Sequence, residues 1–464
     1  MRASIVLTIA SLLLGAGFPA RAEKQLPPKP GTPKAFQVPT PQRFALDNGL
    51  AVTLVDYGTI PKARVALVVD IGNANETAVQ VWLADVTGDL LLQGSTTRSA
   101  LEISEAAARM GGSLEIGVGA ETTELGGAVL SEFAPEMVRL VADVVRHPVF
   151  PESELARIKN DRQRQLSIAR SQSQQLATER FRAVLYGEAH PFGRVFPTAE
   201  MIEGYSVQDT RAFYEAGFGP KRARLYVVGR LDHDAVRAAV QESFGGWTGS
   251  APAPVAAPSP RTTRSLAIVD RPDAVQTTLM LGLPVPDPSD PGYVTLAVTN
   301  TLLGGFFSSR ITTNIREDKG YTYSPFSQIS SRRGDAYWVQ NADVSTEVTA
   351  PALQEIFFEI DRLQGEPPSK AELAGVQSYM AGIFVLRNSS RAGIVNQLEF
   401  LARHGLPEDY LRQYVDKVLA VTPADVQEAA RKHLRDGEMT IVAVGDQKVI
   451  AGELAPFAEA KEKE

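Results

Sequence analysis

The chain of 464 residues is 44% apolar and 7% aromatic, with 47 basic and 54 acidic side chains. A single hydrophobic core rarely grows beyond ~300 residues, so this length and composition favour at least two folded lobes. The net charge of −7 disfavours a nucleic-acid-binding protein, because such proteins carry a basic excess. The absence of cysteine excludes disulfides, thiol nucleophiles and cysteine metal sites.

The first 22 residues have the pattern of a secretory signal. Arg2 precedes an apolar run over residues 5–15, and Ala20-Arg21-Ala22 supplies the small residues of a cleavage site. We expect cleavage after Ala22, and the loss of Arg2 and Arg21 takes the net charge from −7 to −9. No apolar run approaches the ~20 residues that span a bilayer, so a soluble exported protein is expected.

A proline-rich segment over residues 23–42 predicts an extended arm or a disordered leader. Residues 44–54 then predict a hairpin with a type I′ turn at Asn48-Gly49. A buried strand is expected over residues 65–71, helices over 81–93 and 96–110, and a pair of strands over 113–130. These elements belong to a first lobe over residues 43–250.

A second proline-rich segment, residues 251–262, predicts a linker to a second lobe over 263–455, which a charged tail over 456–464 follows. Strands near 265–283, a helix from Tyr293 and strands across 336–344 repeat the order of the first lobe. Asp209 matches Asp425 at a separation of 216, and two further segments match at similar separations. The pattern predicts a duplicated α+β fold: two homologous lobes, each an antiparallel sheet backed by helices.

The sequence lacks the motifs of common catalytic sites. The five histidines include no pair spaced four residues apart, as a helical zinc pair requires; they are His147, His190, His233, His404 and His433. Nucleophile-elbow, phosphate-loop and dinucleotide-binding motifs are also missing. A conventional zinc site is therefore not expected, and each histidine is interpreted as structural or exposed.

The segment Leu83-Ala-Asp-Val-Thr-Gly-Asp-Leu-Leu-Leu-Gln-Gly-Ser95 resembles the inverted zinc-motif helix of pitrilysin-type peptidases, which are similar to the mitochondrial processing peptidase. The resemblance places Asp85 and Asp89 at the positions of the two ligand histidines, and Gly88 at that of the general-base glutamate. Glycine has no carboxylate with which to take a proton from water. The family's third ligand is a glutamate on a later helix, and residues 162–165 offer none. We expect no metal in this chain.

An alternative is that Asp85 and Asp89, one helical turn apart, bind a hard cation such as calcium. Two carboxylates form a thin shell for an ion that takes six to eight oxygen ligands. A solvated or hydrogen-bonded pair of aspartates is therefore the favoured interpretation.

The second lobe keeps the family's motif. Residues 303–324 are similar, almost position by position, to a glycine-rich turn followed by Ser-Ser-Arg, Ile-Arg-Glu and Gly-x-x-Tyr-Ser, and residues 187–194 resemble the family's His-Pro-x-Gly-Arg loop. The resemblance implies that Arg316 and Tyr323 support substrate and transition state in an active site. Gly304 and Gly305 could form a substrate loop, with Arg310 as a companion, or only a tight turn. From the residues alone, Arg316 could instead pair with a carboxylate while Tyr323 packs in the core.

This resemblance implies the zinc-free subunit of a heterodimeric periplasmic processing peptidase, one half of a clamshell that binds an extended polypeptide. Zinc is expected only in a homologous partner subunit, whose active site this chain completes; no hydrolase activity is expected of the chain alone. The alternatives are a noncatalytic peptide-binding protein and a structural protein of the same fold. Nucleic acid and membrane spans are not expected.

Overall fold

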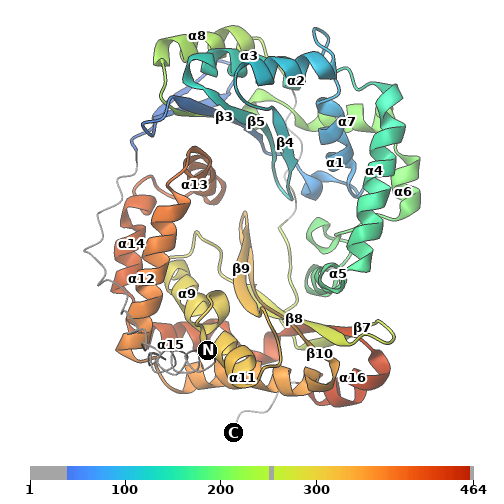
Figure 1. The fold of residues 1–464 in the computed structure, drawn as a ribbon, viewed down its shortest axis with the longest axis vertical. Helices are drawn as coiled ribbons and strands as arrows, with labels where there is room; N and C mark the ends of the chain where they lie inside the picture. Colours follow the sequence, from blue (N-terminus) through green and yellow to red (C-terminus); the bar gives the residue numbers. More distant parts are fainter. Residues whose placement is uncertain (1–38, 250–254, 256, 460–464) are drawn as a thin grey trace, which may run out of the picture. The chain divides into compact units, whose positions relative to one another are not determined.

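The computed structural model describes residues 39–249, 255 and 257–459, which form two β-sheets backed by helices (Figure 1). The predicted α+β class is confirmed. The predicted signal peptide, most of the arm and part of the linker lie outside the described residues. Gln42, assigned to the arm from the sequence, already belongs to the first strand, and a 3₁₀ turn over Ala455–Phe457 extends the last helix into the predicted tail.

The first sheet has six strands in the order β1-β2-β6-β3-β5-β4. Its strands are β1 (Gln42–Ala45), β2 (Ala51–Asp56), β3 (Lys62–Val69), β4 (Glu115–Val118), β5 (Thr123–Leu130) and β6 (Ala223–Gly229). The second sheet has the order β7-β11-β8-β10-β9. Its strands are β7 (Ser265–Asp270), β8 (Gln276–Val285), β9 (Phe326–Arg332), β10 (Asp335–Ser345) and β11 (Thr440–Gly445).

The two sheets repeat one topology. Without β1, the order β2-β6-β3-β5-β4 corresponds strand for strand to β7-β11-β8-β10-β9. The sequence predicted antiparallel sheets. Most strand pairs are antiparallel, but each sheet contains one parallel pair, β2 with β6 and β7 with β11. The matched aspartates Asp209 and Asp425 occupy the same place, each closing a capping box at the start of a helix. This agreement is what a duplicated unit requires.

Sixteen α-helices are assigned within the described ranges. In the first lobe they are α1 (Leu83–Leu91), α2 (Ala100–Arg109), α3 (Ala134–Arg146), α4 (Glu152–Ser171), α5 (Ser173–Tyr186), α6 (Ala199–Gly204), α7 (Val207–Gly217) and α8 (His233–Phe244). In the second lobe they are α9 (Tyr293–Asn300), α10 (Arg310–Thr312), α11 (Thr349–Gly365), α12 (Lys370–Arg387), α13 (Arg391–His404), α14 (Tyr410–Ala420), α15 (Pro423–His433) and α16 (Gln447–Leu454).

The predicted type I′ turn is wrong. β1 and β2 pair as expected, but Ala45 lies opposite Ala51, so five residues connect the strands instead of two. Gly49 has a φ of 93°, whereas Asn48 does not take the positive φ that the turn type needs. The Asn48 side chain instead donates to the backbone carbonyls of Phe244 and Trp247, at 2.7 and 3.0 Å. A contact nearly 200 residues away therefore decides the shape of this loop.

One helix from each lobe packs on the sheet of the other lobe. Figure 1 shows α5 next to β7 and β8, and α13 next to β3. Phe181 and Leu185 of α5 belong to a buried cluster with Met280, Val339 and Val442 of the second sheet. α13 covers part of the second face of the first sheet at β3 and β6, and the central strands are buried on both faces while the outer strands β1, β4, β7 and β9 keep exposed positions.

Polar contacts complete the junction between α13 and the first sheet. Arg224 of β6 donates to both carboxylate oxygens of Asp70, at 2.5 and 2.8 Å, and to Glu399 of α13 at 2.9 and 3.1 Å. Arg333 of the second lobe also reaches Asp70, at 3.2 Å. Burial would raise the pKa of Asp70, but the hydrogen bonds and charges of Arg224 and Arg333 together hold it below its usual value.

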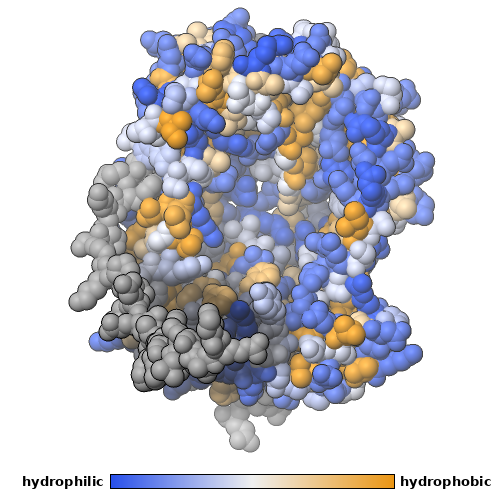
Figure 2. Space-filling model, viewed as in Figure 1, coloured by the Kyte–Doolittle hydropathy of each residue, from blue (hydrophilic) through white to orange (hydrophobic). Residues whose placement is uncertain are grey.

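Hydrophilic surface predominates on the face in Figure 2, where hydrophobic side chains show only in separate groups. Within the described ranges, no helix has the length and apolar character needed to cross a membrane.

His404, at the end of α13, makes stability depend on pH. Its side chain is 8% exposed, and burial, with the nearby charge of Arg403, lowers its pKa from 6.5 to about 4. The folded state therefore binds this proton less readily than the unfolded chain. We expect the free energy of unfolding to be unaffected by this group above pH 6.5 and to fall by up to about 3 kcal/mol as the pH drops towards 4.

Urea unfolding between pH 4 and 8 measures this effect. His404→Gln should flatten the decline relative to the wild-type chain, whereas His147→Gln, at an exposed position after α3, should follow the wild-type curve. Equal slopes for wild type and His404→Gln would contradict the assignment.

Candidate functional site

The helix of the altered zinc motif, α1, begins at an unusual turn. Trp82 precedes it with a φ of 69°, which is rare for a bulky residue. The carboxylate of Glu76 accepts hydrogen bonds from the backbone N–H groups of Trp82 and Ala84, at 3.0 and 2.8 Å, and from Asn73 at 3.1 Å. Burial raises the pKa of Glu76 to about 8, although these hydrogen bonds act to lower it. Glu76 thus anchors the helix that presents Asp85 and Asp89.

Arg162 of α4 pairs with both aspartates of the altered motif. Its Nε donates to Asp89 Oδ2 at 2.7 Å, and its Nη1 donates to Asp85 Oδ1 at 3.1 Å. Its Nη2 also donates to the backbone carbonyl of Asp85 at 3.2 Å. Asn73 donates to the remaining Asp85 oxygen at 2.7 Å. Burial raises the pKa of both carboxyl groups, and the charge of Arg162 opposes that rise.

The residues of α1 and α4 do not fit a bound zinc ion. A guanidinium group lies between the two carboxylates that would have to bind the metal, and within the described chain no three acidic or histidine side chains converge on one point. Gly88 also lacks space for a side chain: a Cβ atom there would lie 2.7 Å from Val118 Cγ2 of β4. An added glutamate would require the Val118 side chain to shift, so Gly88 also disfavours a general base at this position.

In the second lobe, Arg316 lies between two aromatic rings. Its guanidinium carbon is 4.1 Å from the ring centre of Phe307 and 5.4 Å from that of Tyr323. Its side chain is 21% exposed and approaches Glu317 at 3.3 Å, so the carboxylate pairing weighed from the sequence does occur. Tyr323 is 81% exposed, which excludes the alternative that it packs in the core. The aromatic stacking holds a cation and a phenol together at the surface.

Two π-helical segments lie in this region: Thr301–Gly305 precedes the pair, and Thr313–Asp318 contains Arg316. Such segments are rare and are frequent at functional sites. Gly304 packs tightly, since a Cβ atom there would lie 2.6 Å from Ser327 Oγ and Gln340 Oε1. At Gly305 the nearest atom, the Asn300 amide nitrogen, would be 2.8 Å away.

Arg310 occupies a different environment from Arg316. It is 8% exposed, and it donates to both carboxylate oxygens of Glu372 at 2.7 and 3.0 Å. This pairing joins α10 to the start of α12. The substrate-loop role of Gly304, Gly305 and Arg310 stays a prediction, and their contacts show a packing role for each.

Sequence reasoning did not identify the roles of Arg162 and Phe307. Arg162 was noted only as a position without a ligand glutamate. The sequence did contain a signal for Arg162. Asp85 and Asp89 are acidic at the two positions that the family gives to histidine ligands, and Arg162 is basic in the segment that the family gives to the ligand glutamate. Phe307 gave no comparable signal, because a ring that stacks on a cation nine residues later depends on the path of the intervening chain.

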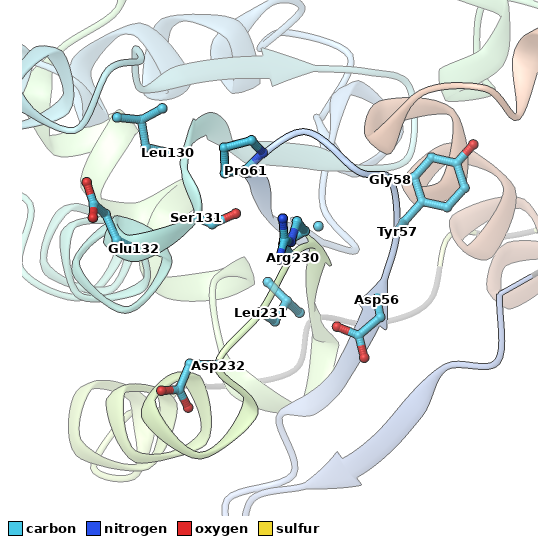
Figure 3. Close-up of a pocket in the computed structure, with 11 residues that line it drawn as sticks. Asp56, Tyr57, Gly58, Pro61, Leu130, Ser131, Glu132, Arg230, Leu231 and Asp232 are labelled. Atoms are coloured by element: carbon cyan, nitrogen blue, oxygen red, sulfur yellow. The ribbon is translucent and has the colours of Figure 1, made fainter.

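A cavity of about 810 Å³ lies where β2 and β6 end (Figure 3). Figure 3 shows Arg230 near its centre, among Asp56, Ser131 and Asp232. None of the residues predicted for the site lines this cavity. The candidate functional residues therefore lie in the two motif regions.

Loss of Arg162 should destabilise the chain by leaving two largely buried carboxylates without their cation. We expect Arg162→Ala to lower the free energy of unfolding by about 2 kcal/mol, less than for a fully buried pair because the three side chains keep partial exposure. Arg164→Ala is the matched control on the same helix, since Arg164 is 66% exposed and pairs only with Asp161 among the described residues. It should change stability by less than about 0.5 kcal/mol. Equal effects in chemical unfolding would contradict the structural role of Arg162.

Two family models match the chain. The one described as insulinase (peptidase family M16) matches residues 52–194, and the one described as peptidase M16 inactive domain matches residues 205–380. An uncharacterized zinc protease of Mycobacterium tuberculosis is 29% identical over 365 residues, covering 77% of this chain and 80% of that protein. An uncharacterized zinc protease of Bacillus subtilis is 25% identical over 292 residues, covering 62% and 70%.

Solved structures agree with these matches. A crystal structure of a peptidase M16 inactive domain from Pseudomonas fluorescens superposes with a TM-score of 0.80 at 25% identity, covering 88% of this chain and 98% of that one. A protease from Helicobacter pylori has the same fold, with a TM-score of 0.79 at 19% identity over 88% and 99% of the two chains. The matched models, the repeated sheets and the motif positions together show that the chain belongs to peptidase family M16, the pitrilysin-type peptidases.

Proposed function

We propose that this chain is the zinc-free subunit of a heterodimeric, periplasmic processing peptidase. It binds extended polypeptide and completes the active site of a homologous partner that supplies the metal and the general base. The observation that carries this proposal is the contrast between the lobes. The metal position of the first lobe is filled by the Arg162 guanidinium, whereas Arg316 and Tyr323 of the second lobe form an accessible pair.

The first lobe explains why the chain would need a partner. A hydrolytic zinc site needs a metal with an open position and a nearby base. Here the two carboxylates are committed to Arg162, and Gly88 supplies no base. Several relatives carry the name zinc protease, an activity that Asp85, Gly88 and Asp89 of this chain are not suited to support alone.

The second lobe has groups suited to acting on a bound peptide. A guanidinium presents planar donors that can hold a substrate carbonyl. A phenol can donate to the oxygen that becomes negatively charged as a tetrahedral intermediate forms. Stacking on Phe307 restricts Arg316, and no hydrogen bond within the described chain occupies the Tyr323 hydroxyl. Such fixed donors cost little reorganisation during reaction.

Reconstitution with a partner tests this function. A quenched fluorescent peptide library is incubated with zinc and this chain, with a zinc-motif homologue encoded in the same genome, and with both together. We expect cleavage to rise strongly only in the mixture. Arg316→Ala or Tyr323→Phe should each lower kcat of the mixture by about 100-fold, the usual effect of removing one oxyanion donor. Tyr321→Phe, two residues before Tyr323, is the control and should retain activity.

Two outcomes would contradict the proposal. Zinc-dependent cleavage by this chain alone would mean that it carries its own catalytic site. Absence of any stimulation in a complex whose formation is verified by size-exclusion chromatography would favour a noncatalytic peptide-binding or structural role.

A further inference from the structure

Arg316 and the residue two positions before it lie on opposite sides of one helical segment. Thr313–Asp318 forms a π-helix, and residues two apart on a helix face roughly opposite directions. The Arg316 guanidinium lies over the rings of Phe307 and Tyr323. Asn314 is 7% exposed, and its side chain contacts α11 instead. The direction of Arg316 is therefore linked to the contacts that Asn314 makes on the other side of the segment.

The Asn314 amide joins this segment to α11 through two carboxylates. Its Nδ2 donates to Glu355 Oε2 and to Glu359 Oε1, each at 2.9 Å. The two glutamates lie four residues apart on α11, and Glu359 is buried. We call Asn314, Glu355 and Glu359 the amide clamp. Because the clamp uses both N–H bonds of one amide, it fixes the rotation of the Asn314 side chain as well as its position.

The clamp requires an amide at residue 314. A reversed amide would direct its carbonyl oxygen at two carboxylates, and an aspartate would add a third negative charge beside them. Like charges four residues apart on a helix repel each other, so the shared donor also relieves a repulsion within α11. Lys319 pairs with Glu355 and Arg362 pairs with Glu359, each at 3.2 Å, and these cations balance the two charges.

The other contacts of the segment lie near its ends. Arg310 joins the preceding turn to Glu372 of α12. At the far end, the N–H group of Gly320 donates to the carbonyl oxygen of Arg316 at 3.1 Å. Between these points, Asn314 supplies the hydrogen bonds from the segment to α11. Loss of the amide would let the segment turn about its axis, which would move Arg316 out of the aromatic stack.

A cavity of about 460 Å³ borders the amide clamp. All three side chains of the clamp line it, together with Lys319 and Arg362. A carboxylate that lost the amide could turn towards this cavity while keeping its basic partner, so no buried charge would be left unpaired. We therefore expect Asn314→Ala to fold, which allows its effect on Arg316 to be measured.

We propose that Asn314 is a positioning residue for Arg316 and that Glu355 and Glu359 hold it in place. The inference rests on the proposed function, in which Arg316 acts on the bound substrate, and it identifies the side chains that set the direction of Arg316. Asn314 lies on the far side of the segment and acts through Arg316.

Chemical modification of the chain alone tests the clamp without a partner subunit. Phenylglyoxal reacts with guanidinium groups, and mass spectrometry of the digested chain gives the rate at each arginine. We expect Asn314→Ala to raise the rate at Arg316 about threefold or more, because local release of the segment exposes the stacked guanidinium. The rate at Arg310, which is 8% exposed, should not change, whereas general unfolding would raise both rates.

Gln354→Ala is the matched control for this experiment. Gln354 is an exposed residue of α11 that lines the same cavity and lies outside the amide clamp. Its replacement should leave the modification rates of Arg316 and Arg310 unchanged. Circular dichroism would verify that both variants are folded.

A double variant in the mixture with the zinc-motif homologue shows whether Asn314 acts through Arg316. Asn314→Ala should lower kcat about tenfold in the otherwise wild-type chain, but less than about twofold in the Arg316→Ala chain, because residues that act as a unit have non-additive effects. A residue that only stabilised the fold would lower kcat by the same factor in both chains. Gln354→Ala should leave kcat unchanged.

The proposal is overturned if Arg316 is modified equally fast in the wild-type chain and in folded Asn314→Ala, or if the effects of Asn314→Ala and Arg316→Ala on kcat are additive. Faster modification of Arg316 in a chain that stimulates no partner would uphold the clamp while refuting the complementing-subunit function. Stimulation of a partner that Asn314→Ala leaves unchanged would uphold that function and refute the positioning role.

Discussion

The reciprocal packing of α5 and α13 constrains the whole molecule. The two helices begin 218 residues apart, at equivalent places in the repeat, and each covers the sheet of the other lobe. The first lobe has a core of its own residues, and a second buried cluster joins α5 to the sheet of the second lobe. The junction therefore fixes the positions of α1 with its aspartates and of the segment that carries Arg316. Its polar part, centred on Arg224 with Asp70 and Glu399, adds direction to contacts that burial alone would leave unspecific.

The duplicated lobes have diverged in chemistry while keeping one topology. In the first lobe, Arg162 forms ion pairs with Asp85 and Asp89, the residues that the resemblance assigns to metal-ligand positions. Arg162 satisfies both carboxylates, and β4 closes over Gly88. In the second lobe, stacking keeps Arg316 and Tyr323 exposed together. The ion pair of the first lobe thus contributes to stability, and the second lobe presents an accessible cation and phenol.

The sequence was sufficient for the elements and insufficient for their long-range partners. The opening elements of each lobe, the repeat, and the helix that carries Asp85 and Asp89 follow from periodicity and motif spacing, which are local properties. The helices α3 to α8 were not individually predicted. The loop at Asn48 differed from its prediction because carbonyl groups near residue 245 bind its side chain. The sequence did not predict that Arg162 pairs with the two aspartates, or that α5 and α13 each pack on the sheet of the other lobe. Contacts between distant segments produce no periodic pattern in the sequence. The exposure of Tyr323 likewise required the fold.

The Arg162 guanidinium occupies the space between Asp85 and Asp89, where a metal ion would have to bind. Calorimetric titration of zinc into the purified chain and into an Asp85→Ala/Asp89→Ala double variant, with metal content checked by mass spectrometry, measures whether the altered motif binds zinc. We expect the wild-type chain and the double variant to behave alike, with no stoichiometric zinc bound at the altered motif. One equivalent of tightly bound zinc in the wild-type chain that is lost in the double variant would contradict it.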